Sequence, residues 1–208
     1  MAVRKIRIWP DPILKQTARR VASVDSEIKT LVEDMFETMY KANGIGLAAT
    51  QVGVDQRVVT IDLDPKGQGK EDEDVRRELG EWGFRGPIAL INPEVVAGEG
   101  AITWEEGCLS LPGVNEPVKR KEHVRVKAIG VDGNEFTIEG SGLFAVCLQH
   151  ETDHLNGRVF VEYLSKLKRD VIRRKMERLI EEEEQDEDEE QDEDAVGAAS
   201  SSRTAARL

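Results

Sequence analysis

The segment from His150 to His154 has residue types and a spacing that could bind a catalytic metal ion. It reads His-Glu-Thr-Asp-His and is the chain's only match to the pattern His-Glu-x-x-His. On a helix, residues four apart lie on one face, so both rings could bind one metal while Glu151 points towards its open side. The pattern is typical of metal-dependent hydrolases, although a histidine on an apolar face is more often a core residue than a ligand.

The residues before this pattern strengthen its interpretation as a metal site. Every residue from Leu143 to Leu148 is apolar, which predicts a helix that is buried on all sides. Buried polar and charged groups are costly unless they are paired or bind a metal, so the cluster that follows needs a common partner. Asn156 and Gly157 can adopt a left-handed conformation, so we expect the helix to end just past His154.

A third ligand is required, because catalytic metal sites usually have three protein ligands and a water. The metzincin pattern does not supply it, since Phe160 stands where its last histidine would be. Cys147 would lie ~10 Å along the helix axis from His154, whereas ligands of one metal lie within ~4 Å, so we expect Cys147 to pack in the core. We therefore take Cys108, within the segment from Glu105 to Gly113, as the third ligand.

Three segments, in order and suitably spaced, resemble the signature motifs of the peptide deformylase family. They are GIGLAATQVG from Gly44 to Gly53, EGCLS from Glu106 to Ser110, and QHETDHLNG from Gln149 to Gly157. With Pro10-Asp11-Pro12 near the start and the basic residues after Leu164, the resemblance covers residues 1–180. It implies a hydrolase that removes the N-formyl group from the formyl-methionine end of nascent proteins and releases formate.

The resemblance implies further roles around the metal. Glu151, the general base of the pattern, would take a proton from the metal-activated water and later deliver it to the departing amine. By resemblance, the oxyanion would be held by the metal, the backbone N–H of Leu109 and the side chain of Gln51. Glu106 would pair with Arg120 and would not react. The pair would stabilise the segment from Glu105 to Gly113 that carries Cys108, called the metal loop below, and a solvated glutamate is the alternative.

The three ligands would hold one divalent metal ion per chain. A thiolate and two neutral imidazoles accept Zn²⁺ comfortably. The resemblance instead favours Fe²⁺, and the ligand types alone leave Zn²⁺ or another divalent ion open.

The methionine side chain of such a substrate needs an apolar pocket. The resemblance implies that the backbone of Gly46 pairs with the peptide and that the pocket is built from Ile45, Trp104, Leu143, Val146, Cys147 and the ring of His150. Trp104 departs from the aliphatic residue that many relatives carry at this position. The size of the pocket, and the tolerance for residues after methionine, therefore stay open.

Two other functions fit parts of the pattern. A zinc endopeptidase shares His-Glu-x-x-His but needs a third His, Glu or Asp after the helix, for which Glu162 is the only close candidate. The non-enzymatic alternative is a ribosome-associated metal-binding protein that has lost its chemistry. The presence of Glu151 and Gln51 argues against it.

The elements that must position these residues are expected to form an α+β fold, with mostly antiparallel strands packed around the buried helix that carries His-Glu-x-x-His. Apolar residues at helical spacing from Ile28 to Tyr40 predict an amphipathic N-terminal helix, capped by Asp25 or Ser26 and ended by Gly44. Asp132-Gly133-Asn134 predicts a hairpin turn. Strands are expected over Val3–Trp9, Val58–Leu63, Ile88–Val96, Ala101–Trp104, His123–Val131 and Glu135–Glu139.

A basic helix is expected from Leu164 to Ile180. Its apolar face would consist of Leu167, Val171, Ile172, Met176 and Leu179. The resemblance implies that this helix docks on ribosomal RNA, to whose phosphates its Lys and Arg residues would be attracted. A helix that is simply solvated is the alternative.

The formal net charge of −12 belongs mostly to the C-terminal end. Residues 181–194 hold twelve of the 41 acidic residues and no Lys or Arg. We expect a catalytic domain over residues 1–180 and an acidic, disordered tail over residues 181–208. Residues 64–87 are expected to form a charged surface insertion with one helical turn near Val75–Leu79.

The sequence also limits the compartment and the partners. It has no apolar segment long enough to cross a bilayer, and its first residues lack the apolar core of a secretion signal. We expect a cytoplasmic protein with no membrane or DNA partner and with no disulfide between its two cysteines. His123 has no companion at ligand spacing and is expected to be exposed or to support the site, but not to bind metal.

Overall fold

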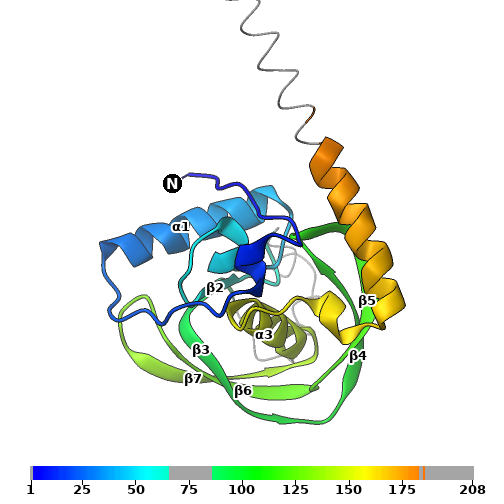
Figure 1. The fold of residues 1–208 in the computed structure, drawn as a ribbon. Coiled ribbons are helices and arrows are strands. Elements are labelled where there is room, and N and C mark those ends of the chain that lie inside the picture. Colours follow the sequence, from blue (N-terminus) through cyan, green and yellow to red (C-terminus); the bar gives the residue numbers. More distant parts are fainter. Residues whose placement is uncertain (1, 66–85, 183–184, 186–208) are drawn as a thin grey trace, which may run out of the picture.

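The computed structural model describes residues 2–65, 86–182 and 185, and within them it has two antiparallel sheets around a central helix (Figure 1). The first sheet has the strand order β1-β2-β3-β6-β7, and the second pairs β4 with β5. The strands are β1 (Gly46–Ala48), β2 (Val58–Ile61), β3 (Ile88–Glu99), β4 (Ile102–Cys108), β5 (Leu111–Arg120), β6 (His123–Ile129) and β7 (Glu135–Ser141). The predicted α+β class is therefore confirmed.

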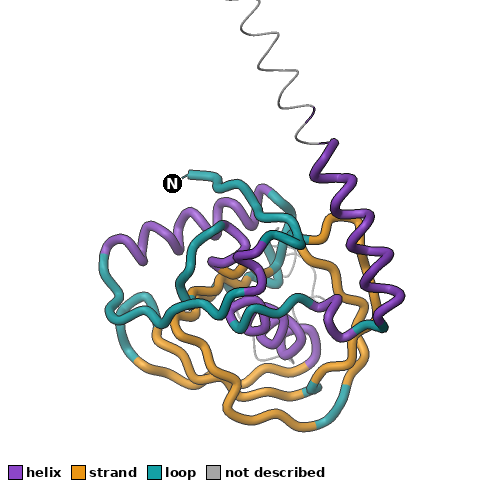
Figure 2. Tube along the Cα trace, in the orientation of Figure 1, coloured by secondary structure: helices purple, strands orange, loops and turns teal. Residues whose placement is uncertain are grey.

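The helices cover the sheets and fill the space between them (Figure 2). They are α1 (Ser26–Lys41), α3 (Gly142–Leu155), the 3₁₀ helices Pro12–Lys15, Ala49–Val52 and Phe160–Tyr163, and a C-terminal helix over residues 166–182. Among the described residues, no helix is both long and apolar enough to cross a membrane.

The five-stranded sheet separates two hydrophobic cores. Successive strand residues point to opposite faces, so Val59 and Ile61 pack in the core that contains α3, whereas Val58 packs in the core that contains α1. Neighbouring residues of β3 divide in the same way between the two cores. A third cluster lies between the β4–β5 sheet, the segment around Trp9 and the C-terminal helix.

Helix α3 is buried as its apolar sequence predicts. Phe144 and Ala145 are fully buried, and the helix packs against β1, β2, β3, β6 and β7. It ends where expected, with Asn156 as the cap and Gly157 at φ 71°. The guanidinium of Arg57 donates hydrogen bonds to Leu155 O and Asn156 Oδ1, which joins this end of the helix to the residue that precedes β2.

Helix α1 has the predicted cap but a different end. The side chain of Asp25 accepts hydrogen bonds from the first-turn backbone amides. The left-handed residue after the helix is Asn43, at φ 55°, and not Gly44 as we expected. Gly44 instead allows close packing, because a Cβ added there would lie 2.7 Å from Leu109 Cδ1.

The expected strand over Val3–Trp9 is wrong. In the described structure this segment is extended but is assigned to no strand. Its backbone amides bond to three different parts of the chain: Arg4 N donates to Thr38 Oγ1 of α1, Arg7 N donates to Gln51 O, and Trp9 N donates to Ser110 O. The partners of the N-terminal segment are therefore spread over α1, the 3₁₀ helix Ala49–Val52 and the turn after β4 rather than along one strand, which strand periodicity cannot reveal.

The other five expected strands occur, with different limits, whereas β1 and β5 were not predicted. β3 continues to Glu99, β4 continues to Cys108, β7 continues to Ser141, and β2 and β6 end two residues early. The predicted hairpin is confirmed, because β6 and β7 pair as antiparallel strands across the turn that contains Gly133 at φ 84°. The expected helical turn near Val75–Leu79 lies outside the described residues.

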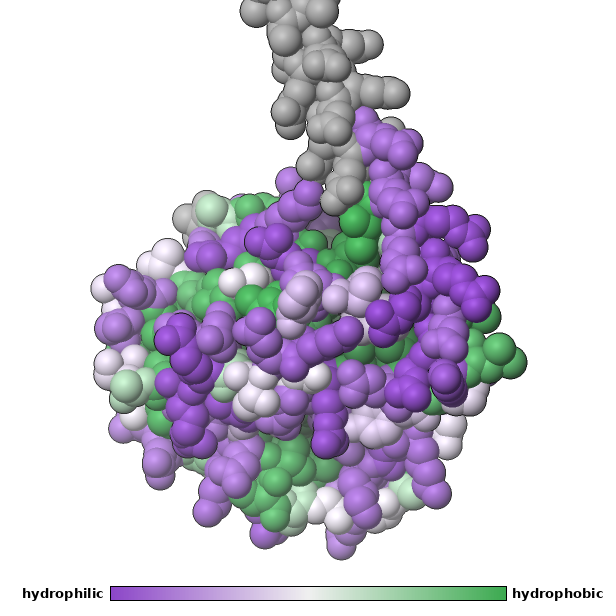
Figure 3. Space-filling model, in the orientation of Figure 1, coloured by the Kyte–Doolittle hydropathy of each residue, from purple (hydrophilic) through white to green (hydrophobic). Residues whose placement is uncertain are grey.

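The C-terminal helix packs through fewer apolar residues than its sequence predicts. Ile172 and Met176 are buried, but Leu167 and Val171 are 74% and 57% exposed, so they do not belong to the buried face. The helix begins at residue 166 and lies along β5, and its visible surface is hydrophilic (Figures 1 and 3). Residues 181, 182 and 185, which were expected in the disordered tail, are helical, and the rest of the acidic segment lies outside the described residues.

Gly157 offers a test of how firmly the end of α3 is held. A Cβ added at Gly157 would lie 2.6 Å from Lys15 O, whereas a Cβ at Gly133 would meet nothing within 4 Å. Both residues have positive φ. We expect Gly133→Ala to lower the free energy of unfolding by about 1 kcal/mol through backbone strain. Gly157→Ala should lower it by about 2–4 kcal/mol, since the overlap is added.

Urea denaturation of both variants measures the difference. If both variants lose the same free energy of unfolding, the close approach of Gly157 to Lys15 O does not restrict which side chain fits at position 157.

Candidate active site

The sequence-predicted ligands come together at the junction of β4 and α3. Cys108 is the last residue of β4, and His150 and His154 lie one turn apart on α3. One ligand atom from each residue can be chosen so that all three lie within 4.8 Å of one another. Cys108 Sγ is 3.2 Å from His154 Nε2. The described residues contain no other such group of three.

The chemistry of this cluster suits a divalent metal ion. A thiolate and two imidazoles are a common tetrahedral set that leaves a fourth position open. Burial lowers the pKa of His154 well below its ordinary value, so its imidazole is neutral, as a metal ligand must be. Burial also opposes a charge on His150, but Cys108 and Glu106 raise its pKa well above the ordinary value. Metal binding at His150 would therefore displace a proton.

Glu151 lies beside the cluster in a buried environment. Burial is the main reason that its pKa is raised to about 7, and its Oε2 atom has no hydrogen-bond partner among the described residues. A carboxyl group with this pKa can accept and return a proton near neutral pH. Gly46 of β1 makes room for it, because a Cβ at Gly46 would overlap Glu151 Oε1 and lie 2.9 Å from Cys147 Sγ.

The Gln51 side chain is aimed at the loop that carries Cys108. Its Oε1 accepts a hydrogen bond from Ala48 N, which fixes the amide orientation. Its Nε2 donates to Ser110 Oγ at 3.1 Å and lies 3.4 Å from Cys108 Sγ. Ser110 was part of a recognised motif but was given no role, and the structure shows that it orients the glutamine. Leu109 follows Cys108 in the chain and, like Gln51, lines a cavity that opens beside the cluster.

A cavity of about 590 Å³ opens beside the cluster, within the size range of ligand sites. All six predicted substrate-contacting residues line it, namely Ile45, Gly46, Trp104, Leu143, Val146 and Cys147. Sequence reasoning missed others, among them Ile6 and Asn43. Ile6 comes from the extended N-terminal segment, whose path along α1 the sequence did not predict.

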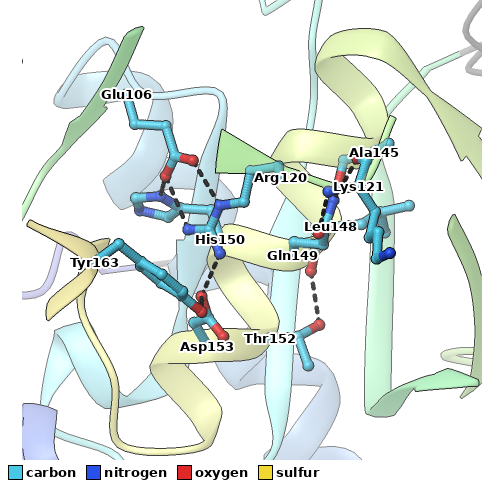
Figure 4. A network of polar contacts seen from close by, with 10 residues as sticks. All are labelled: Glu106, Arg120, Lys121, Ala145, Leu148, Gln149, His150, Thr152, Asp153 and Tyr163. Carbon is cyan, nitrogen blue, oxygen red and sulfur yellow. Dashed lines mark hydrogen bonds and ion pairs between the residues drawn. The ribbon is translucent and has the colours of Figure 1, made fainter. Parts of the chain in front are cut away.

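A buried ion pair between β4 and β5 contacts α3 through His150 and Asp153 (Figure 4). Arg120 Nε and Nη2 donate to the two carboxylate oxygens of Glu106 at 2.6 and 3.0 Å, as the expected pairing requires. His150 Nδ1 lies 2.7 Å from Glu106 Oε2, which leaves Nε2 of His150 for the metal cluster. Asp153 is a further partner of Arg120, a contact that the sequence did not predict.

A second connection joins α3 to the end of β5. Gln149 Oε1 accepts from Lys121 N, and Gln149 Nε2 donates to Lys121 O and to Ala145 O (Figure 4). The amide of Gln149 thus pairs with both backbone groups of Lys121, as a neighbouring strand would. Together with the ion pair, it fixes the rotation of α3 and hence the direction of both histidines.

Two residues considered in the sequence analysis lie apart from the cluster. His123 is exposed, and its Nδ1 lies 2.9 Å from Ser141 Oγ. Glu162 is exposed and is not part of the metal-binding group. Both cysteines are free thiols.

Comparisons with known proteins agree on one family. The family model described as polypeptide deformylase matches residues 3–170. The peptide deformylase of Alkalilimnicola ehrlichii is 50% identical over 182 residues, which cover 88% of this chain and 93% of that protein. The peptide deformylase of Saccharophagus degradans is 49% identical over 179 residues, covering 86% and 94%.

Solved structures give the same result. The crystal structure of a peptide deformylase from Legionella pneumophila is similar with a TM-score of 0.76 and 42% identity, and the match covers 88% of this chain and 98% of that one. The peptide deformylase from Ehrlichia chaffeensis in complex with actinonin has a TM-score of 0.76 and 40% identity, covering 86% and 98%.

The contact between Glu106 and His150 predicts how strongly the cluster retains metal. Glu106→Gln keeps the size and shape of the side chain but removes the negative charge that orients His150 and neutralises the positive charge of Arg120. We expect metal affinity to fall about 10–100-fold, and the free energy of unfolding to fall by about 3 kcal/mol. Competition with a chelator and urea denaturation measure the two effects.

The matched control is Glu105→Gln, the same change at an exposed neighbouring position. It should leave both quantities near their wild-type values. Equal metal affinity in the two variants would contradict the orienting role of Glu106.

Proposed function

The chain belongs to the peptide deformylase family, and we propose that it hydrolyses the N-formyl group of formyl-methionine at the start of nascent proteins. The products would be formate and a free amino terminus. The observation that carries this proposal is the Cys108, His150 and His154 cluster, with Glu151 beside it, at the side of an apolar cavity. The arrangement joins a hydrolytic centre to a pocket that suits a methionine side chain.

In this proposal, Cys108, His150 and His154 hold one divalent metal ion. When bound, such an ion lowers the pKa of a water and polarises a carbonyl oxygen. We propose Fe²⁺ as the resident ion, with Zn²⁺ or another divalent ion as alternatives that the same ligands accept. The buried, neutral imidazole of His154 supports the binding of a metal ion by this cluster.

Glu151 is the proposed general base and general acid. It would take a proton from the attacking water and return it to the departing amine, which is the task suited to a carboxyl group with a pKa of about 7. The side chain of Gln51 and the backbone N–H of Leu109 would donate to the oxyanion. The hydrogen bond that Gln51 makes to Ser110 supports this role by fixing the direction of its amide.

The substrate would bind in the cavity beside this centre. Ile45, Leu143 and Val146 would contact the methionine side chain, together with Cys147 and Trp104. β1 is an edge strand, so the backbone of Gly46 can pair with an extended peptide. Trp104 has a larger side chain than an aliphatic residue, and we propose that it limits which residues after methionine are accepted.

The basic C-terminal helix is the proposed contact with the ribosome. Lys166, Arg174 and Arg178 are exposed and can approach ribosomal RNA phosphates. Other basic side chains of the helix bond to the body of the protein, as Lys168 does with Glu116 and Lys175 with Gly113 O. We propose that residues 1–180 form the catalytic domain, that residues 181–208 are an acidic tail, and that the enzyme acts in the cytoplasm.

Two measurements on one preparation test the proposed chemistry. Anaerobically purified protein should release formate from a formyl-Met-Ala peptide and contain one metal ion per chain. Glu151→Gln should keep the metal and lose about 10²–10⁴-fold in kcat, since it removes the proton acceptor. Cys108→Ala should lose metal and activity together.

Several results would contradict the proposal. Metal-loaded wild type that releases no formate would favour the binding-protein alternative. A Cys108→Ala variant that retains metal and cleaves internal peptide bonds would favour the endopeptidase, with Glu162 as a ligand. Full activity in Glu151→Gln would exclude the glutamate as the base.

A further inference from the structure

Tyr163 lies outside the cavity but is connected to the metal cluster through a chain of polar contacts. We propose that Tyr163 is a positioning residue for His150, acting through Asp153, Arg120 and Glu106. The inference rests on the metal site of the proposed function.

The inner contact of this chain sets the ring of His150. Its Nδ1 lies 2.7 Å from Glu106 Oε2, and the carboxylate is buried. A ring held by one nitrogen has little freedom to turn its other nitrogen away from the metal position. Any group that fixes Glu106 therefore also fixes the ligand direction of His150.

Arg120 fixes Glu106 and joins it to α3. Its side chain is 3% exposed, and it donates to both oxygens of Glu106 and, through Nη1, to Asp153 Oδ2 at 2.5 Å. Asp153 lies three residues after His150, on the same side of the helix. The guanidinium thus bridges the metal loop and the helix that carries the two histidines.

Tyr163 holds the outer side of this bridge in two ways (Figure 4). Its hydroxyl donates to Asp153 Oδ2 at 2.8 Å, so the same oxygen accepts from both Tyr163 and Arg120. Its ring also packs on the guanidinium, with Arg120 Cζ 4.6 Å from the ring centroid. A cation over an aromatic face is attracted to it, and the ring also keeps water from the ion pair.

The hydroxyl of Tyr163 supplies a hydrogen-bond donor that the carboxylates around Arg120 need. One guanidinium lies between two carboxylates, so the carboxylates need further donors. His150 supplies one to Glu106 and Tyr163 supplies the other to Asp153. Burial and the neighbouring Asp153 charge raise the pKa of Tyr163, so its hydroxyl keeps the proton that it donates.

The position of Tyr163 separates this role from substrate binding. It is the last residue of the 3₁₀ helix Phe160–Tyr163, shortly before the C-terminal helix, and it does not line the cavity. A change at Tyr163 should therefore alter how His150 holds the metal and leave the substrate contacts as they are. The expected result is a lower kcat with an unchanged KM.

Release of bound Zn²⁺ to a chromogenic chelator tests the inference directly. Tyr163→Phe removes the hydroxyl and keeps the ring, whereas Tyr163→Ala removes both. We expect release to be about threefold faster in Tyr163→Phe and about tenfold faster in Tyr163→Ala, because contacts behind a ligand typically change metal affinity 10–100-fold and this one is more remote. The absorption bands of the Co²⁺-loaded variants should shift in the same order.

Tyr40→Phe is the matched control. Tyr40 is also partly exposed, and its hydroxyl donates to a carboxylate at a similar distance, Asp62 Oδ2 at 2.7 Å. It should release Zn²⁺ at the wild-type rate. If both Tyr163 variants also release Zn²⁺ at that rate, or if Tyr40→Phe accelerates release equally, the inference is overturned.

The measurement is independent of catalysis. A folded Zn²⁺-loaded protein that hydrolyses no formyl peptide would contradict the proposed function, while the release rates would still decide the role of Tyr163. Should Tyr163→Ala lower the melting temperature strongly, Tyr163→Phe decides the outcome, since it keeps the ring on Arg120.

Discussion

The ion pair between Glu106 and Arg120 is the interaction on which the site depends. Both side chains are almost fully buried, at 2% and 3% exposed. Burying two charges costs more than their attraction returns unless their remaining hydrogen-bonding groups are also satisfied. His150 and Asp153 meet that requirement, and both belong to α3. The need to satisfy one buried pair therefore holds the segment that carries Cys108 against the helix that carries His150 and His154.

The same buried surroundings give neighbouring groups of α3 different properties. Burial lowers the pKa of His154, so that its imidazole is neutral, and raises the pKa of Glu151 to about 7, whereas Glu106 and Cys108 favour the charged form of His150. The apolar residues from Leu143 to Leu148 provide the low-dielectric environment in which these differences arise. Packing and reactivity thus have one cause in this helix.

Local patterns in the sequence predicted the parts of the molecule that depend on local chemistry. The spacing of His150 and His154, the apolar run before them and the hairpin turn were read correctly. Cys108 was chosen by excluding the other candidates for the third ligand, and the cavity residues were named through the family resemblance. The strand expected over Val3–Trp9 was wrong, because its backbone amides bond to separate segments, among them α1 and Ser110, and not to one neighbouring strand. The prediction that Leu167 and Val171 are buried was wrong, because periodicity identifies an apolar helix face but not whether another element packs against it. The role of Tyr163 was missed because its contacts join segments that are distant in the sequence.

The central position of α3 has a consequence for how the chain is made. This helix follows the seven strands of the described structure, yet it lies in the middle of the fold and packs against most of them. During vectorial synthesis, the strands therefore emerge before the helix that covers their apolar faces. Folding must wait for long-range contacts, which are slow to form and leave strand surfaces open to association with other chains. The apolar faces of the strands that pack on α3 thus stay uncovered until that helix has been synthesised.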